Sequence, residues 1–216
     1  MHSIDPSGWI FLSAAAVVIL LICELRGFRP GIAPAKLTAS TAFVGLALSL
    51  GALDSSLGQI ILIGLLLCWL GDALLIPTGQ SFWFQLGIGS FLLGHVAYAI
   101  AFVTWAVSPA ALVVGGLVMA ATGALAFRWL RPHVPANFRK PVIAYIVVIG
   151  AMAACAISAS TGGAPLSVAV GALAFAASDL SVARDRFVAP NFVHAAWGLP
   201  AYFAAQMILA SSIRLL

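Results

Sequence analysis

The chain has 216 residues, of which 63% are hydrophobic and only 7% are charged. A soluble domain carries about 25% charged residues, so this composition excludes a water-soluble globular protein. The net charge is +4, but the basic residues are few and lie in short loops. That distribution argues against a nucleic-acid surface and favours an integral membrane protein.

Eight apolar stretches predict eight helices that cross a bilayer. A spanning helix needs about 20 mostly apolar residues, and clusters of Gly, Pro, Ser and charged residues separate the candidates. The sequence therefore predicts one polytopic membrane domain, residues 1–216, folded as an all-α bundle of eight transmembrane helices. The predicted spans are 8–24, 37–53, 59–76, 85–105, 109–127, 141–159, 164–183 and 192–212.

The basic residues lie almost entirely on one side of this eight-span arrangement. On that side are Arg26, Arg29, Lys36, Arg128, Arg131, Arg139, Lys140, Arg184 and Arg186, and only Arg214 lies on the other. Cytoplasmic loops collect Lys and Arg. We therefore expect both termini to face away from the cytoplasm, in a bacterial-type cytoplasmic (inner) membrane.

Three pairs of residues recur at nearly constant separations of 104, 107 and 104 residues, obtained by subtraction. The pairs are Lys36 and Lys140, Asp72 and Asp179, and Tyr98 and Tyr202. With an even number of spans in each half, such a pattern fits two parallel four-helix halves. Helices of similar length would produce the same spacing by coincidence, so both interpretations stay open.

Two aspartates lie inside predicted spans and at the same predicted depth. Asp72 in "LLLCWLGDALLIP" and Asp179 in "GALAFAASDLSVARDRF" each precede a span end by four residues, which is about 6 Å along a helix. An ionised carboxylate is costly in hydrocarbon. We therefore expect both to turn inward, toward each other, a polar partner or a water-filled cavity. The alternative is that they reach nearby headgroups or make only interhelical hydrogen bonds.

Other polar residues have the spacing needed to line the same cavity. His95 and Tyr98 in "GHVAYAIAF" are three residues apart and share a helix face. On the last span a polar stripe recurs every four residues, at His194, Gly198, Tyr202 and Gln206. Lys36 at the start of a span is either a topology charge or an ammonium that binds a lipid phosphate. Each of these residues also has a purely structural interpretation, as a packed side chain or an interfacial anchor.

The sequence favours no metal and no cofactor. His95, His194, Asp72 and Asp179 supply enough nitrogen and oxygen ligands for a zinc-bound water, but no HExxH or comparable spacing supports such a site. The three cysteines lie in apolar runs without a CxxC spacing, which is typical of buried structural thiols.

The order of these motifs resembles the YhhN family of lysoplasmalogenases. The matching pieces are a Lys opening the second span, "GD" late in the third, "HVAY" in the fourth, "SD" late in the seventh and "AYFAAQ" in the eighth. The resemblance covers nearly the whole chain. It implies an integral membrane hydrolase that cleaves the vinyl ether bond of lysoplasmalogens to a fatty aldehyde and glycerophosphocholine or glycerophosphoethanolamine.

The same resemblance implies a set of site residues. The family's acidic pair corresponds to Asp72 and Asp179, and the matching polar positions are Lys36, His95, Tyr98, Tyr202 and Gln206. The chain departs from the pattern at two places. Ser181 stands where an apolar residue is expected, and the region of Tyr145, "KPVIAYIVVIGAM", matches only loosely.

Hydrolysis of a vinyl ether begins with protonation of its β-carbon, which gives an oxocarbenium ion that water captures. The reaction needs an acid that is protonated near neutral pH and a negative charge facing the cation, which two carboxylates in different surroundings provide. We predict that Asp179 donates the proton and Asp72 stabilises the cation or activates water, with the reverse assignment open. The expected partners are a lysophospholipid and the bilayer, with no nucleic acid.

A proton-coupled membrane transporter is the alternative from another class. Intramembrane acids and a possible internal repeat are typical of such proteins. However, the two halves lack a corresponding pair of Gly- or Pro-interrupted helices. We therefore place the hydrolase first and the transporter second.

Overall fold

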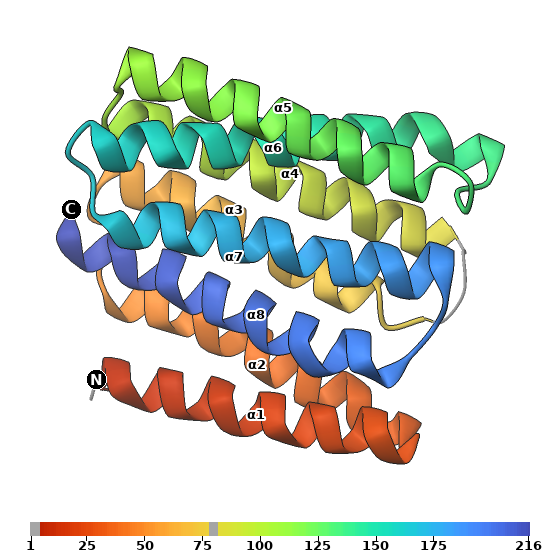
Figure 1. Ribbon diagram of the computed structural model, residues 1–216. Coiled ribbons are helices and arrows are strands. Elements are labelled where there is room, and N and C mark those ends of the chain that lie inside the picture. Colours follow the sequence, from red (N-terminus) through yellow and green to blue (C-terminus); the bar gives the residue numbers. More distant parts are fainter. Residues whose placement is uncertain (1–4, 78–81) are drawn as a thin grey trace.

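The computed structural model describes residues 5–77 and 82–216 and is a bundle of long helices (Figure 1). The long helices are α1 (Pro6–Arg26), α2 (Arg29–Ser49), α3 (Ser56–Leu74), α4 (Phe82–Trp105), α5 (Pro109–Leu130), α6 (Arg139–Thr161), α7 (Leu166–Ala183) and α8 (Phe192–Ser211). Three short helical segments follow or precede them, η1 (Ala136–Phe138), η2 (Arg184–Val188) and η3 (Ser212–Leu215). Eight candidate spans are long and apolar enough to cross a membrane, which confirms the predicted fold class.

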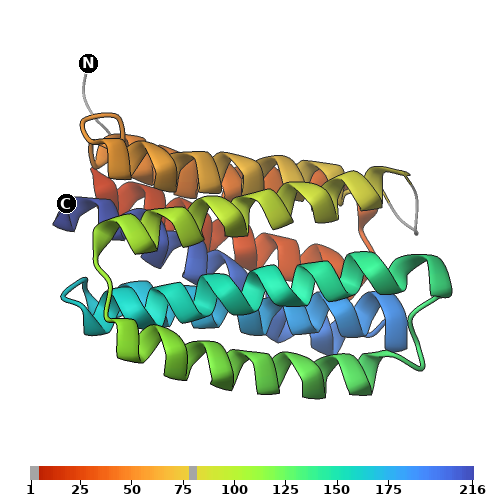
Figure 2. The same cartoon turned by 90° about the horizontal axis from the view of Figure 1, so that it is seen from above.

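The first turn of α1 and the end of α8 lie at the same end of the bundle (Figures 1 and 2). This follows from the even number of antiparallel crossings. Arg26 closes α1 and Arg29 opens α2 at the opposite end, where the α5–α6 connection with its basic residues also lies. That this basic end faces the cytoplasm stays a prediction from the distribution of Lys and Arg.

Helices that follow one another in the chain pack on one another within α1–α4 and within α5–α8. Between these two groups, α4 packs on α6 and α2 packs on α8. A two-fold exchange of the groups would convert one of these contacts into the other, but the contacts of α8 with α1 and α3 have no counterparts of similar extent between α4 and α5 or α7. The arrangement in two halves therefore stays a prediction. Helix α8 also contacts α1 and α3, so it lies near the centre of the molecule, whereas α5 lies at the edge (Figure 1).

The main core of buried apolar side chains draws on every long helix except α5. Its continuity supports the prediction of a single domain. A second, smaller core of Phe84, Leu130, Val134 and Phe138 closes the end of the bundle where α5 turns into α6. The few buried positions on α5 are Gly115 and Leu130, so most of this helix presents apolar side chains outward.

Helix α2 begins eight residues earlier than predicted, at Arg29 instead of residue 37. The Gly and Pro residues of "RGFRPGIAPAK" are typical of a loop, yet the chain is helical from Arg29 onward. Pro30 lies in the first turn of the helix, where its missing N–H is not needed, and Pro34 costs the helix only one further hydrogen bond. As a result, Lys36 lies about two turns inside α2 instead of at its start.

Glycines allow two of the closest helix contacts. A Cβ atom at Gly64 of α3 would lie 2.6 Å from the Tyr98 ring of α4. A Cβ atom at Gly198 of α8 would lie 1.7 Å from Oγ and 2.5 Å from Cβ of Ser181 on α7. Ser181, which departs from the family pattern, is therefore a small side chain buried in the α7–α8 contact.

We expect Gly198→Ala to loosen the α7–α8 contact, because the added methyl group overlaps the Ser181 side chain. Overpacking of this kind costs about 1–3 kcal/mol, so the thermal unfolding midpoint in detergent should fall. Gly116→Ala in α5 is the matched control, because a Cβ atom there has nothing within 4 Å. An equal midpoint for the two variants would contradict this account of the contact.

Candidate active site

Asp72, close to the end of α3, is buried and accepts contacts from three donors on two other helices. Lys36 Nζ lies 3.2 Å from Oδ1. Ser40 Oγ lies 2.6 Å from Oδ2 and Tyr202 OH lies 2.7 Å from the same oxygen. Lys36 and Ser40 are one turn apart on α2, and Tyr202 comes from α8. Because all three groups donate, the arrangement suits an ionised carboxylate.

The Lys36 side chain points into the bundle. Its side chain is 14% exposed and that of Asp72 only 2%, so the ammonium group lies at the edge of a buried cluster. The contact with Asp72 makes Lys36 more than a charge that orients the span. Lipid offers no counter-ion to a buried carboxylate, so α2 supplies it from the neighbouring helix.

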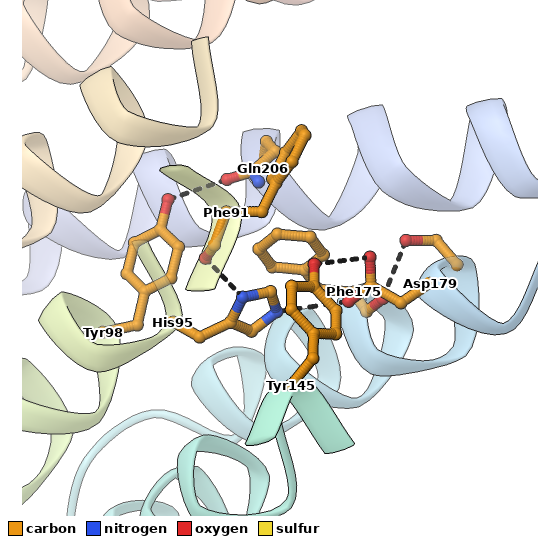
Figure 3. A network of polar contacts seen from close by, with 8 residues as sticks. Phe91, His95, Tyr98, Tyr145, Phe175, Asp179 and Gln206 are labelled. Atoms are coloured by element: carbon orange, nitrogen blue, oxygen red, sulfur yellow. Dashed lines mark hydrogen bonds and ion pairs between the residues drawn. The ribbon is translucent and has the colours of Figure 1, made fainter. Parts of the chain in front are cut away.

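Asp179, late in α7, has a different set of neighbours (Figure 3). His95 Nε2 lies 3.2 Å from its Oδ2 atom, outside the alignment of a hydrogen bond, and both atoms are buried without a hydrogen-bond partner. Tyr145 OH on α6 donates to Oδ1 at 3.3 Å. The other ring nitrogen of His95, Nδ1, is 2.6 Å from the carbonyl oxygen of Phe91. The imidazole is fully buried.

A layer of aromatic rings lies between the two acidic clusters. Phe175 stacks on His95 with ring centroids 4.3 Å apart, and its other contacts include the ring of Tyr202 at 5.4 Å. Phe91 packs edge-on against both Phe175 and Tyr202. Within residues 5–77 and 82–216, no hydrogen bond or ion pair joins the two aspartates. They belong to neighbouring clusters that meet through these rings.

Tyr98 and Gln206 form a third polar link, between α4 and α8. Tyr98 OH donates to Oε1 of Gln206 at 2.7 Å, and both side chains are fully buried. The Nε2 atom of Gln206 has no hydrogen-bond partner. Figure 3 shows this link on the side of His95 that faces away from Asp179. The seven site residues predicted from the sequence thus form two acidic clusters and one adjoining amide–phenol pair.

His194 does not join these clusters. It is buried near the start of α8, and its Nδ1 atom has no hydrogen-bond partner. Among the described residues, no group of three or more His, Cys, Asp or Glu side chains lies close enough together to hold a metal ion. The alternative zinc site of His95, His194, Asp72 and Asp179 is therefore not assembled in this arrangement.

Two site residues were missed at the level of sequence, Ser40 and Tyr145. Ser40 follows Lys36 by four residues, so it shares a helix face with it. This shared face is not evident in the sequence, because the Gly and Pro residues before residue 37 are typical of a loop. Tyr145 carried no spacing signal, because the polar partner found for it among the described residues, Asp179, is on another helix and 34 residues away.

We expect Lys36→Met to destabilise the protein, because it leaves the Asp72 carboxylate buried without its counter-ion. Breaking a buried pair in this way costs about 3–5 kcal/mol, which a lower thermal unfolding midpoint in detergent would report. Adding Asp72→Asn to Lys36→Met should recover most of the loss. Lys140→Met is the matched control, since Lys140 is exposed. If the double variant is no more stable than Lys36→Met alone, the pairing is refuted.

Comparison with known proteins finds relatives that are named lysoplasmalogenases. The chain is 34% identical over 158 residues to lysoplasmalogenase TMEM86A of Bos taurus and 35% identical to that of Homo sapiens, each covering 70% of this chain and 64% of the relative. It is 33% identical over 153 residues to the lysoplasmalogenase of Mycobacterium bovis, covering 68% of this chain and 57% of the relative. The chain thus spans less than two thirds of the length of these relatives.

No solved structure matches the chain. The sequence model of the YhhN family matches residues 32–213. That range runs from the first turn of α2 to η3 and contains all the residues of both acidic clusters. The chain therefore belongs to the YhhN family, as the motifs around Asp72 and Asp179 predicted.

Proposed function

We propose that this protein is a lysoplasmalogenase, which hydrolyses the vinyl ether bond of a lysoplasmalogen to a fatty aldehyde and glycerophosphocholine or glycerophosphoethanolamine. The names of its relatives support the reaction class. The observation that carries the proposal is the contrast between two buried carboxylates. Asp72 accepts from an ammonium and two hydroxyl groups, whereas Asp179 faces an imidazole and a single phenol.

This contrast suits the two roles that the reaction requires. A carboxylate that is surrounded by donors stays ionised and can stabilise a cation, while a second carboxyl with fewer donors can carry a proton. We assign the proton donor to Asp179 and the stabilising anion to Asp72. Asp179 protonates the β-carbon of the vinyl ether, which produces an oxocarbenium ion at the α-carbon.

Water completes the hydrolysis by adding to the cationic carbon. Its hydroxyl group forms the new carbon–oxygen bond of a hemiacetal, and its proton returns to the enzyme. Collapse of the hemiacetal moves the hydroxyl proton to the glycerol oxygen and breaks the bond to the glycerol. Asp72 is the group assigned to hold the cation or direct the water. The rings of Phe175 and Tyr202 pack against each other between the two acids, and the proposal has the flat vinyl ether bind against this layer.

Lys36 has a role in this proposal that differs from the one expected from sequence. Its ammonium group lies 3.2 Å from Asp72, so it keeps that carboxylate charged and in place. We therefore assign Lys36 as an orienting residue for Asp72 in preference to a binding group for the lipid phosphate. Tyr202 donates a hydrogen bond to the same carboxylate. Next to this cluster, the hydrogen bond between Tyr98 and Gln206 holds α4 against α8.

The depth of the site matches the substrate. Asp72 is two residues from the end of α3, and Asp179 is four residues from the end of α7, whose helical path continues through η2 to Val188. Both therefore lie in the half of the bundle toward its basic end. The vinyl ether of a lysoplasmalogen is next to its glycerol, where the acyl region meets the headgroups. We propose that the basic end is the cytoplasmic one in a bacterial-type inner membrane, with both termini on the other side, because nine of ten basic residues gather there.

We expect Asp72→Asn and Asp179→Asn each to abolish aldehyde release from a lysoplasmenyl lipid, because each removes a charge or proton that the transition state needs. Asp54→Asn makes the same chemical change at an exposed position outside the site and should stay fully active. Mass spectrometry of purified protein in detergent, given lyso-ether and lyso-acyl lipids, measures the products. A cooperative unfolding transition in each inactive variant would show that it is folded.

The same assay in D₂O identifies the reaction. Protonation of the β-carbon places one deuterium on the carbon next to the aldehyde group, whereas cleavage of an acyl ester places none. A fully active Asp72→Asn/Asp179→Asn variant, or an aldehyde without deuterium, would refute the mechanism. Lipid transport without any aldehyde would instead support the proton-coupled transporter.

A further inference from the structure

The contacts of His95 determine which of its ring nitrogens carries a proton. Nδ1 lies 2.6 Å from the carbonyl oxygen of Phe91. A carbonyl oxygen only accepts hydrogen bonds, so Nδ1 must be the donor. A neutral imidazole has only one N–H group. In the neutral ring, therefore, Nε2 is an acceptor without a proton.

This bare nitrogen faces a second acceptor. Nε2 is 3.2 Å from Oδ2 of Asp179, and two lone pairs repel at that distance. Both atoms are buried and have no other hydrogen-bond partner, so neither is satisfied by another described side chain. One additional proton removes the conflict. A proton on Nε2 gives an imidazolium–carboxylate ion pair at 3.2 Å, and a proton on Oδ2 gives a neutral carboxylic acid beside the nitrogen.

We propose that His95 and Asp179 share a single proton, and that this is the proton delivered to the vinyl ether. This inference rests on the lysoplasmalogenase function proposed above and names His95 as the positioning residue for its acid. Asp179 hands the proton to the β-carbon, which leaves a carboxylate beside a neutral imidazole. The proton released by the attacking water then returns to the same pair, so the balance of protons closes in each turnover.

The surroundings hold this pair in position and do not compete for its proton. Phe175 stacks on the imidazole, and the Tyr145 phenol donates to the other carboxylate oxygen. Other titratable groups near the pair are Cys68 on α3 and the site tyrosines, and thiols and phenols are neutral at pH 7. The Asp72 charge is balanced by Lys36. Along the chain, the next charged side chains are Arg184, Asp185 and Arg186, beyond the end of α7.

The shared proton can be tested without substrate, by ¹⁵N NMR of protein labelled on histidine. The His95 signals are assigned as those lost in His95→Asn. We expect Nδ1 to be protonated in the wild type and Nε2 to show the shift of a nitrogen bonded to a shared proton. Asp179→Asn should return Nε2 to the shift of an unprotonated nitrogen. An unprotonated Nδ1, or an Nε2 signal that Asp179→Asn does not change, would overturn the inference.

Enzyme assays test the same inference with two amide variants, each of which imitates a different part of the His95 ring. The His95→Asn amide sits near the position of Nδ1 and keeps the bond to Phe91, whereas the His95→Gln amide reaches the position of Nε2 near Asp179. We expect His95→Asn to keep its unfolding midpoint, to lower kcat by about 10²–10⁴-fold as loss of general acid catalysis does, and to change the pH profile. We expect His95→Gln to retain more activity because it still contacts Asp179.

If His95→Asn leaves the pH dependence of kcat unchanged, His95 only packs against its neighbours and does not position the acid. If the wild type has no vinyl ether hydrolase activity at all, the proposed function fails while the NMR result still decides whether the proton is shared. The two failures are therefore distinguishable.

A second and independent feature is a hollow lined by arginines at the basic end of the bundle. Phe127, Arg128, Arg131, Pro132 and Arg139 surround about 400 Å³ where α5 turns into α6. The ion pairs found among the described residues join Lys36 to Asp72 and His95 to Asp179. The three arginines therefore line one hollow, and none of them forms an ion pair with a carboxylate of a described residue.

The apolar face above this hollow belongs to α5. This peripheral helix exposes Val113, Val114, Leu117, Val118 and Leu125, so its outer surface suits acyl chains. A lipid lying along α5 would carry its phosphate at the level where the helix ends. Basic hollows between helix ends at the cytoplasmic side of a membrane protein bind anionic lipid headgroups. We propose that the hollow binds the phosphate of an anionic phospholipid whose acyl chains lie along α5.

Native mass spectrometry of delipidated protein with phosphatidylglycerol and with phosphatidylcholine of the same acyl chains tests this site. We expect the wild type to retain phosphatidylglycerol preferentially, and Arg128→Gln/Arg131→Gln/Arg139→Gln to lose that preference by at least about tenfold, because each basic residue contributes about 1 kcal/mol. The control Arg26→Gln/Arg29→Gln/Lys140→Gln removes the same charge from the same end of the bundle and should keep the preference. Equal loss in both triple variants, or equal stabilisation by inorganic phosphate alone, would overturn the proposal.

Discussion

The structure depends on how it accommodates a charged Asp72 among membrane helices. A carboxylate cannot be left unpaired in a medium without water, so helices α2 and α8 must each supply donors to the end of α3. Lys36, Ser40 and Tyr202 meet that requirement. The contacts also fix how α2, α3 and α8 lie around one another, since none of the three donors would reach Asp72 if its helix rotated by one residue. The same interaction thus organises the bundle and holds the Asp72 carboxylate in the ionised form that the proposed reaction uses.

The second acid shows what changes when the donors are fewer. Asp179 lies on the equivalent part of α7, but its neighbours are His95 and Tyr145. Two side chains of the same type therefore have different partners because different helices surround them. Small residues make this possible. Gly198 brings α8 close to α7, and Gly64 leaves room for the Tyr98 ring beside α3, so the polar side chains project from helices that are in close contact.

Much of the fold and part of the site could be predicted from the sequence. Apolar length fixed eight spans, and the cost of buried charge pointed to Asp72 and Asp179. The start of α2 could not be predicted, because Pro30 and Pro34 look like loop residues, although a helix accepts Pro30 in its first turn and here also tolerates Pro34 in its interior. Which polar residue contacts which of the two aspartates could not be predicted either. It depends on which helices adjoin, and spacing along one chain does not report contacts such as Tyr145 with Asp179.

The ring layer of Phe91, Phe175 and Tyr202 has a further consequence. The carbon atoms of these rings neither donate nor accept protons, and the hydroxyl group of Tyr202 donates to Asp72, so the rings separate the two acidic clusters. In the proposed mechanism, this separation lets Asp179 exchange a proton with the substrate while Asp72 keeps its contact with Lys36. The bundle thus holds two acidic clusters with different partners only a few side chains apart. The aromatic layer between them also interrupts proton transfer from one cluster to the other.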